Sequence, residues 1–585
     1  MKKLWANSVV RSRYAVAIVA GLLLAASFPK MSLAGFAWVA PALMVTAALG
    51  KGGFEALRIG YVGGLAYYLA SLYWILLIPD RWHGIPLGPA AGWLALGAYV
   101  ALYPAVWVWA VGGAKCEVRG AKGGMRNAEC GIQGPQSAVH FWVERFEAVA
   151  GETWLQRLAW TVSGAAGWVA LEIVRAKLFS GFPWNLLGAS QYQLVPLIQL
   201  SSLVGIYGVS FLLVWFSLSL LSAAVVMLKR PGLRSAWVGE MALPFLVLAV
   251  VLNFGLRQVR HAETPARTLK VIFIQPSIPQ TMIWDASKVD ERFEELLQLS
   301  EQALTNHTDL LIWPEAAVPK LLYDQKTFNA VAGLARKHHV WMIIGADDAE
   351  PKPNSTKEKD YDYFNSGFLV GPQGQLVARY RKRNLVIFGE YIPRWLPFLK
   401  WFTPIPGDLT AGDRAVPFVL NELQVKTSAL ICFEDVFPEL SRDCTEPDTD
   451  FLVNMTNDGW FGESGEQWQH AASALFRAVE NDLPLLRCSN NGLTCWIDGF
   501  GRFRQIFHDR SGSVYGAGFM MAEIPLREGG ESHATFYNRH GDWFGWGCVG
   551  FSCLTFVWRL MRLRYGLTRT GTDSHDEQIR NLKPK

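Results

Sequence analysis

Cysteine and charged residues are both scarce in this chain. Its 585 residues include eight cysteines, with no Cys-x-x-Cys pair and no Cys/His cluster at zinc spacing. This pattern excludes a disulfide scaffold and the common structural zinc sites. Only 18% of the residues are charged, against about a quarter in soluble domains. The net charge of +5 is small and no basic patch is interleaved with aromatic residues, so nothing indicates nucleic-acid binding.

Hydrophobic residues make up 51% of the chain, and they cluster before residue 256 and again near residue 545. A membrane span needs about 20 mostly apolar residues. We expect spans at residues 14–29, 32–50, 56–79, 88–112, 158–178, 195–228, 235–255 and 541–560. The first run also fits the apolar region of a signal peptide, but the hydrophobic runs that follow it favour a signal anchor.

The orientation of these spans follows from Lys and Arg in the short loops, which insertion directs to the cytoplasm. Basic clusters occur at the N-terminus, at Lys51 and Arg58, at Lys115–Arg126, at Lys229–Arg234 and at Arg559–Arg564. The alternate loops are poorer in Lys and Arg, with Lys30 and Arg81 as exceptions. Seven crossings then place residues 260–535 outside the cytoplasm.

The long segment between the last two spans has the pattern of an α/β domain. Short apolar runs at 269–274, 310–313, 340–345, 367–370, 427–432 and 451–454 predict strands, and 289–304 and 326–337 have helical periodicity. We therefore predict a multi-pass α-helical membrane domain plus an extracytoplasmic α/β domain. The expected boundaries are 1–258 for seven spans with a cytoplasmic loop at 113–157, 259–535 for the α/β domain, 536–565 for a last membrane helix and 566–585 for a polar cytoplasmic tail.

Three short segments of the α/β region carry reactive side chains. Glu315 follows an apolar strand behind a rigid proline, Lys382 lies in a basic stretch, and Cys432 ends a second apolar strand. Taken singly, each has an ordinary explanation as an exposed loop glutamate, a solvated basic turn or a buried core cysteine.

Together the three residues form the minimum set for acyl transfer through a thioester. A free thiol, with a pKa of about 8.5, needs a proton acceptor at neutral pH, and Glu315 can provide it. The oxyanion formed by attack on a carbonyl needs a positive or N–H partner, which Lys382 and the backbone N–H of Phe433 can supply. We also expect the helix start after Cys432 to favour the thiolate.

The order and context of these residues resemble the nitrilase superfamily and, within it, the apolipoprotein N-acyltransferase family. The resemblance covers about residues 14–560 and includes the number of spans. The matching stretches are Ser180–Trp184, Gln275–Gln280 with Trp284, Trp313–Pro319, Leu385–Pro393, Ile431–Glu434, Asn457–Gly462 and Arg487–Gly492.

That resemblance implies an αββα nitrilase sandwich with Glu315, Lys382 and Cys432 as its catalytic residues. It adds Glu390 as a second glutamate of the site, Glu434 as a carboxylate beside the nucleophile, and Trp284 and Trp184 as residues of the substrate entrance. The chain departs from the family at Ile387, where proline is usual, at Phe433, where tyrosine is common, and in a longer 113–157 loop.

The implied activity is transfer of a fatty acyl chain from a membrane phospholipid to the N-terminal amine of diacylglyceryl-cysteine in lipoproteins. The implied enzyme is a monomer of the bacterial inner membrane, with its site on the periplasmic face and with no cofactor or metal. Two alternatives remain: a membrane-tethered nitrilase or amidase for a small soluble substrate, and a transporter or assembly factor with an inactive nitrilase-like domain.

Two further pairs of residues have open roles. Glu172 and Arg175 lie at i,i+3 spacing within a predicted span, where ionisable residues are functional candidates; a structural pair near the outer surface explains them equally well. Cys488 and Cys495 form either a disulfide or, as we expect, two buried thiols.

Overall fold

The computed structural model of the chain describes residues 2–79, 87–112, 153–229, 235–260, 267–283, 285–305, 307–318, 321–322, 324–352, 360–394, 397, 408–526 and 534–565. The predicted tail at 566–585, nearly all of the 113–157 loop and Trp284 lie outside these residues.

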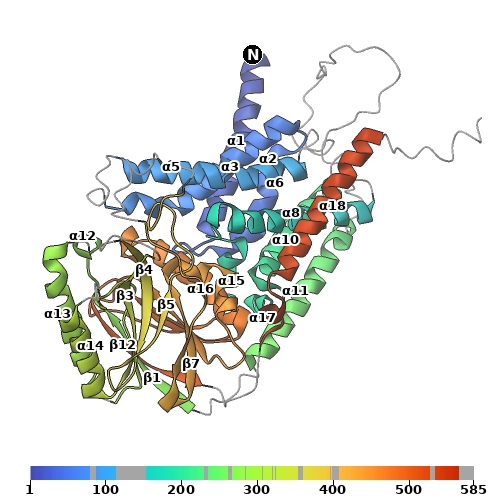
Figure 1. Ribbon diagram of the computed structural model, residues 1–585. Helices are drawn as coiled ribbons and strands as arrows, with labels where there is room; N and C mark the ends of the chain where they lie inside the picture. Colours follow the sequence, from blue (N-terminus) through green and yellow to red (C-terminus); the bar gives the residue numbers. More distant parts are fainter. Residues whose placement is uncertain are drawn as a thin grey trace, which may run out of the picture.

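Two six-stranded sheets form the centre of the C-terminal half (Figure 1). The first has the order β12-β1-β2-β3-β4-β5 and the second β11-β10-β9-β8-β7-β6. The first consists of β1 (Arg267–Gln275), β2 (Leu310–Ile312), β3 (Trp341–Pro351), β4 (Tyr361–Val370), β5 (Leu376–Arg381) and β12 (Gly518–Leu526). The second consists of β6 (Pro417–Leu420), β7 (Val425–Ile431), β8 (Phe451–Thr456), β9 (Leu485–Ser489), β10 (Cys495–Ile497) and β11 (Phe503–Ile506).

The two sheets pack face to face, and helices cover both outer faces. Side chains from each sheet, such as Phe273 and Ile312 from one and Ile431 and Val453 from the other, share one buried core. The first sheet is covered by the amphipathic helices α13 (Val289–Ala303) and α14 (Gln325–His338) (Figure 1). The second sheet is covered by α15 (Pro438–Asp443) and α16 (Glu466–Asn481). The predicted nitrilase-like αββα sandwich is confirmed.

The smaller helices of this half lie in its loops. They are α12 (Gln280–Ile283), η5 (Ala286–Lys288), η7 (Asn421–Leu423), η8 (Cys432–Val436) and η9 (Asp458–Phe461). The predicted strands and both predicted helices occur with shifted ends; for example, the strand expected to include Cys432 ends at Ile431.

Helices also make up the N-terminal half, and α17 and α18 from the end of the described chain pack against it (Figure 1). They are α1 (Lys2–Ala26), η1 (Ala34–Trp38), α2 (Ala40–Ala48), α3 (Gly53–Ser71), η2 (Tyr73–Leu77), α5 (Gly88–Val100), α6 (Leu102–Gly112), α8 (Trp154–Lys177), η3 (Leu178–Ser180), η4 (Leu187–Gln191), α9 (Val195–Ile198), α10 (Ser201–Lys229), α11 (Ala236–Arg260), α17 (Phe536–His540) and α18 (Trp543–Tyr565).

Three helices within the described residues are long and apolar enough to cross a membrane: Gly88–Gly112, Ser201–Leu228 and Trp237–Arg260. Shorter apolar helices are Ser12–Ala26 and Trp543–Trp558. Large apolar side chains are exposed on α11 and α18, among them Phe245, Val250 and Leu554. Exposed apolar surface of this kind is typical of contact with lipid, so this half is a membrane-type domain.

The predicted span at 32–50 is not a single long helix. Residues 32–50 form η1 followed by α2, and the nine residues of α2 rise only about 14 Å, roughly half the apolar thickness of a bilayer. Arg13 of α1 donates to the carbonyls of Ala47 and Leu49 at 3.3 and 3.0 Å, where α2 ends. The chain has therefore returned from the end of α1 to the level of Arg13.

Candidate active site

Glu315, Lys382 and Cys432 lie together at one edge of the sandwich. Glu315 follows β2, Lys382 directly follows β5, and Cys432 directly follows β7. Lys382 Nζ is 3.4 Å from Glu315 Oε1, and the Cys432 thiol is close enough to Glu315 to lower its pKa as a hydrogen-bonding neighbour. The carboxyl ends of β2 and β7 thus bring two of the three groups to the place where α/β folds commonly bind ligands.

The nucleophile candidate is held in a strained turn. Cys432 has a φ of 51°, a left-handed conformation that is uncommon for a residue with a side chain. The turn is fixed because Asn454 Nδ2 donates to the Cys432 carbonyl at 2.9 Å. Cys432 is partly exposed, whereas Ile431 and Glu434 on either side are buried. Strain of this kind persists where the surroundings over-determine it, as at active sites.

Glu434 supports this turn through its hydrogen bonds. Its buried carboxylate accepts from the backbone N–H groups of Ile431, Arg383 and Asn384 at 2.8, 2.6 and 3.1 Å, and from the Tyr380 hydroxyl at 2.9 Å. Four donors occupy both oxygens, so Glu434 connects the Cys432 turn to the Lys382 segment and has no capacity left for the thiol proton.

Lys382 is shared between two carboxylates. Its Nζ lies 2.8 Å from Glu390 Oε1, and Asn365 Nδ2 donates to Glu315 and to Glu390 at 2.7 and 3.1 Å. Glu315 Oε2 is buried and has no hydrogen-bond partner among the described residues. Lys382 and Asn365 therefore fix one oxygen of Glu315, and the other is free to accept a proton. Asn365 lies within β4 and was not among the predicted site residues.

The electrostatics of the site leave the proton on the thiol at rest. Burial and the negative charge of Glu315 raise the pKa of Cys432 well above its usual range, although Lys382 opposes this. The helix that starts at Cys432 is the five-residue η8, and burial together with Glu315 determines the direction of the thiol pKa. Burial also raises the pKa of Glu315, which makes it a stronger base. Burial lowers the pKa of Lys382, but Glu390 and Glu315 raise it well above normal, so Lys382 stays charged.

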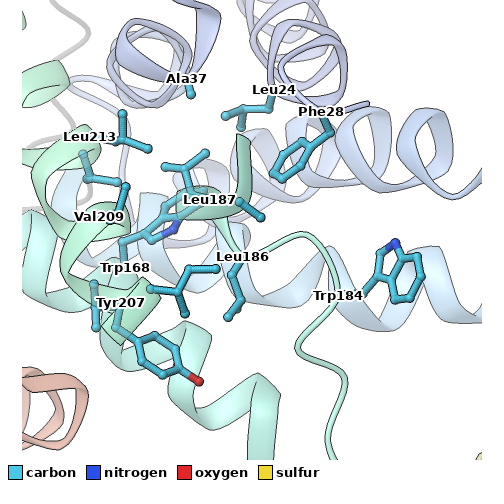
Figure 2. Close-up of a cluster of buried hydrophobic side chains, with 14 of the residues drawn as sticks. Leu24, Phe28, Ala37, Trp168, Trp184, Leu186, Leu187, Tyr207, Val209 and Leu213 are labelled. Carbon is cyan, nitrogen blue, oxygen red and sulfur yellow. The ribbon is translucent and has the colours of Figure 1, made fainter. Parts of the chain in front are cut away.

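The aromatic residue of the N-terminal half that was predicted at the entrance lies against the nucleophile turn. The Trp184 ring stacks on Phe433 at 6.0 Å and lies 5.4 Å from the His470 ring. Figure 2 shows Trp184 at the side of a cluster of buried side chains, with Leu186 and Leu187 on the same loop. Trp184 is almost fully buried, so it packs between the two halves of the chain. The other predicted entrance residue, Trp284, lies outside the described residues.

A buried ionic cluster lies behind Cys432, and it was not predicted. His470 lies 2.8 Å from Asp435 and 3.0 Å from Asp458, while Arg487 pairs with the same two carboxylates at 2.7 and 2.9 Å. Although burial and Arg487 oppose it, Asp435 and Asp458 raise the pKa of His470 to about 9. Asp458, Glu466 and His470 also form a set that could hold a metal ion. Arg487 donates to both oxygens of Asp458, so one carboxylate of that set is already engaged in an ion pair.

Two other pairs of residues were singled out in the sequence, Glu172 with Arg175 and Cys488 with Cys495. Glu172 accepts from the Trp168 ring N–H and the Leu187 backbone, and Arg175 donates to the Tyr68 hydroxyl. Cys488 and Cys495 are buried free thiols, as expected.

Comparisons with known proteins cover both halves of the chain. Residues 273–523 match the carbon-nitrogen hydrolase family, and residues 20–127 and 128–219 match the apolipoprotein N-acyltransferase N-terminal domain. A carbon-nitrogen hydrolase of Helicobacter pylori aligns with 44% of this chain and 90% of its own, at 18% identity and a TM-score of 0.33.

Two curated relatives match over most of their lengths. The apolipoprotein N-acyltransferase of Geobacter metallireducens is 33% identical over 93% of this chain and 94% of its own. The enzyme of the same name from Methylococcus capsulatus is 31% identical over 83% and 86%. With a nitrilase-like sandwich, membrane-type helices and this identity over nearly its whole length, the chain belongs to the apolipoprotein N-acyltransferase family.

Proposed function

We propose that this protein transfers a fatty acyl chain from a membrane phospholipid to the α-amine of a diacylglyceryl-cysteine at the N-terminus of a lipoprotein. The observation that carries the proposal is the meeting of Glu315, Lys382 and Cys432 beside Trp184, a residue of the membrane-type half. The names of the relatives supply the lipoprotein acceptor.

The first half-reaction forms a thioester on Cys432. Glu315 takes the thiol proton as the sulfur attacks the ester carbonyl of the phospholipid, and Lys382 with the Phe433 N–H stabilises the oxyanion. The carbonyl–oxygen bond of the ester then breaks. Glu315 returns the proton to the departing alkoxide, which leaves as a lysophospholipid. A raised pKa suits Glu315 for both transfers, because it accepts and releases a proton nearer to neutral pH.

The second half-reaction forms the amide. The lipoprotein α-amine attacks the thioester carbonyl and gives a proton to Glu315. The carbon–sulfur bond breaks, and the Cys432 thiolate takes that proton back. Lys382 stabilises the oxyanion again, and Glu390 with Asn365 keeps its ammonium group in place.

A membrane location suits this chemistry for an energetic reason. Each buried CH₂ group contributes about 0.8 kcal/mol to holding a chain in the bilayer, so a sixteen-carbon chain resists extraction by roughly 12 kcal/mol. An enzyme that uses such chains should work at the membrane surface. Eight spans in an inner membrane, with residues 259–535 on the periplasmic side and a monomeric enzyme, complete the proposal. The end of α2 lies beside Arg13, near the start of the apolar part of α1. Residues 32–50 therefore run back along α1, which supports counting them as one crossing.

The rival proposal is a membrane-tethered amidase for a small soluble substrate. It shares the Glu315, Lys382 and Cys432 site, and it differs in needing no acyl lipid. Incubating the purified protein with phospholipid in detergent micelles should yield an acyl thioester on Cys432, seen by mass spectrometry and cleaved by neutral hydroxylamine. If phospholipid does not acylate Cys432 but short soluble amides do, the protein is an amidase and the proposed acyl transfer is rejected.

The proposed topology has its own test. Short basic loops such as Lys115–Arg126 orient toward the cytoplasm. An alkaline phosphatase fused within residues 320–330 should therefore be active, and one fused at residue 120 should be inactive. A green fluorescent protein at the same two positions should give the opposite pattern. Equal results from both positions would mean that the number of crossings between them is even.

A further inference from the structure

Helix α16 lies between the second sheet and the membrane-type helices. It packs against η8, which contains Cys432, on one side and against α10 on the other. Every residue of the helix except Trp468 is buried, so its polar side chains must find partners within the protein. Those partners lie in both halves of the chain.

Gln469 of α16 connects three separate loops of the N-terminal half. Its Nε2 donates to the carbonyls of Pro29 and Ser71 at 2.9 and 3.2 Å. Its Oε1 accepts from the ring N–H groups of Trp74 and Trp184 at 3.2 and 2.9 Å. Asn185 Nδ2 donates to the same oxygen at 3.2 Å. One buried amide thus provides hydrogen-bond partners for polar groups near the ends of α1 and α3 and in the loop after α8.

Trp184, which donates to Gln469, also packs on the residue next to Cys432. The Trp184 ring stacks on Phe433, whose backbone N–H is the proposed oxyanion donor, and it also touches His470, the neighbour of Gln469 in the helix. His470 in turn binds Asp435 on the nucleophile turn. Gln469 therefore holds the ring that packs on the turn, and the next residue of its helix, His470, forms an ion pair with the turn.

We propose that Gln469 is a positioning residue that sets the register between the lipid-carrying membrane domain and Cys432. This inference rests on the proposed function, because register matters only if the acyl donor is held by the membrane domain. A donor held there must bring its carbonyl to about 3–3.5 Å from the sulfur, and an error of about 1 Å can cost a hundredfold in rate. A small soluble electrophile diffuses to the thiol and needs no such register.

The test compares two reactions at Cys432 in the full-length protein: acylation by phospholipid in micelles and alkylation by iodoacetamide. We expect Gln469→Ala to slow acylation by roughly tenfold to a hundredfold and to leave alkylation close to that of the unaltered protein. Gln469→Glu keeps the side-chain volume but turns an oxygen toward the Pro29 and Ser71 carbonyls. It should slow acylation in the same way without leaving a cavity.

Gln467→Ala is the matched control. Gln467 is a buried glutamine of the same helix, but it bonds to Gly462 and Ser464 within the catalytic half. We expect this variant to retain both reactions, with thermal unfolding showing that all variants are folded. Equal slowing of acylation and alkylation in both Gln469 variants would make Gln469 a simple support of the turn and overturn the inference, as would unchanged acylation. Absence of acylation in the unaltered protein would instead reject the proposed function.

Discussion

Replacing Cys432 with serine should abolish acyl-enzyme formation and turnover while the protein stays folded. The substitution exchanges one atom, and it keeps the Asn454 bond to the backbone carbonyl that fixes the turn. The surroundings already raise the pKa of the thiol, and a serine hydroxyl is far less acidic still. Removal of a nucleophile from a comparable enzyme costs on the order of 10⁶ in kcat. The measurement is the amount of labelled acyl chain bound to protein after incubation with labelled phospholipid.

Cys495→Ser provides the control for this result. Cys495 is a buried free thiol of β10 in the second sheet, so its replacement tests the general effect of losing a sulfur from this domain. It should retain labelling. Normal acyl transfer by purified Cys432→Ser would rule out the thioester mechanism, and loss of labelling in both variants would point to a folding defect instead.

The α/β half was predictable because its central strands are buried on both faces. Such strands are continuous apolar runs, and 269–274 and 451–454 were recognised in this way. The short edge strand β11, Phe503–Ile506, is partly exposed and polar, so its pairing depends on β10 and not on its own pattern. The apolar pattern at 32–50 does not show that α2 is short. Neighbouring helices bury residues of α2 such as Met44 and Val45 completely, so their apolar character is independent of the length of the helix.

Only the site residues that lie in a recognisable local sequence pattern could be predicted. Glu315 and Cys432 follow apolar strands, and the ends of such strands meet at one edge of the fold. Asn365 and Gln469 carry no local signal, since their partners lie 50 and 285 residues away at Glu315 and Trp184. Residues 466–481 place their charged and amide side chains on one face of the helix and their apolar side chains on the other. This is the pattern of a helix with a solvent-exposed face, so the sequence gives no sign that the polar face is buried.

The Glu315→Gln variant should fail in the first half-reaction. Glutamine keeps the size of the side chain and the oxygen that accepts from Asn365, but it cannot take the thiol proton. General-base catalysis contributes about 10²–10⁴-fold, so labelled acyl-enzyme should form slower by that factor. The thiol in this variant should remain open to iodoacetamide, which separates loss of the base from loss of the nucleophile. Acyl-enzyme accumulating at the normal rate would show that another group is the base.

The pH dependence of acylation identifies the same group independently. Only ionised Glu315 accepts a proton, and burial raises its pKa above the usual value of about 4.3. In the unaltered protein the rate should therefore fall as the pH decreases through that raised pKa, and this acid limb should be absent from the residual rate of Glu315→Gln. The negative charge of Glu390 also raises the pKa of Glu315, so Glu390→Gln should move the limb to lower pH. A limb that persists in Glu315→Gln, or that stays fixed in Glu390→Gln, would belong to a different titrating group.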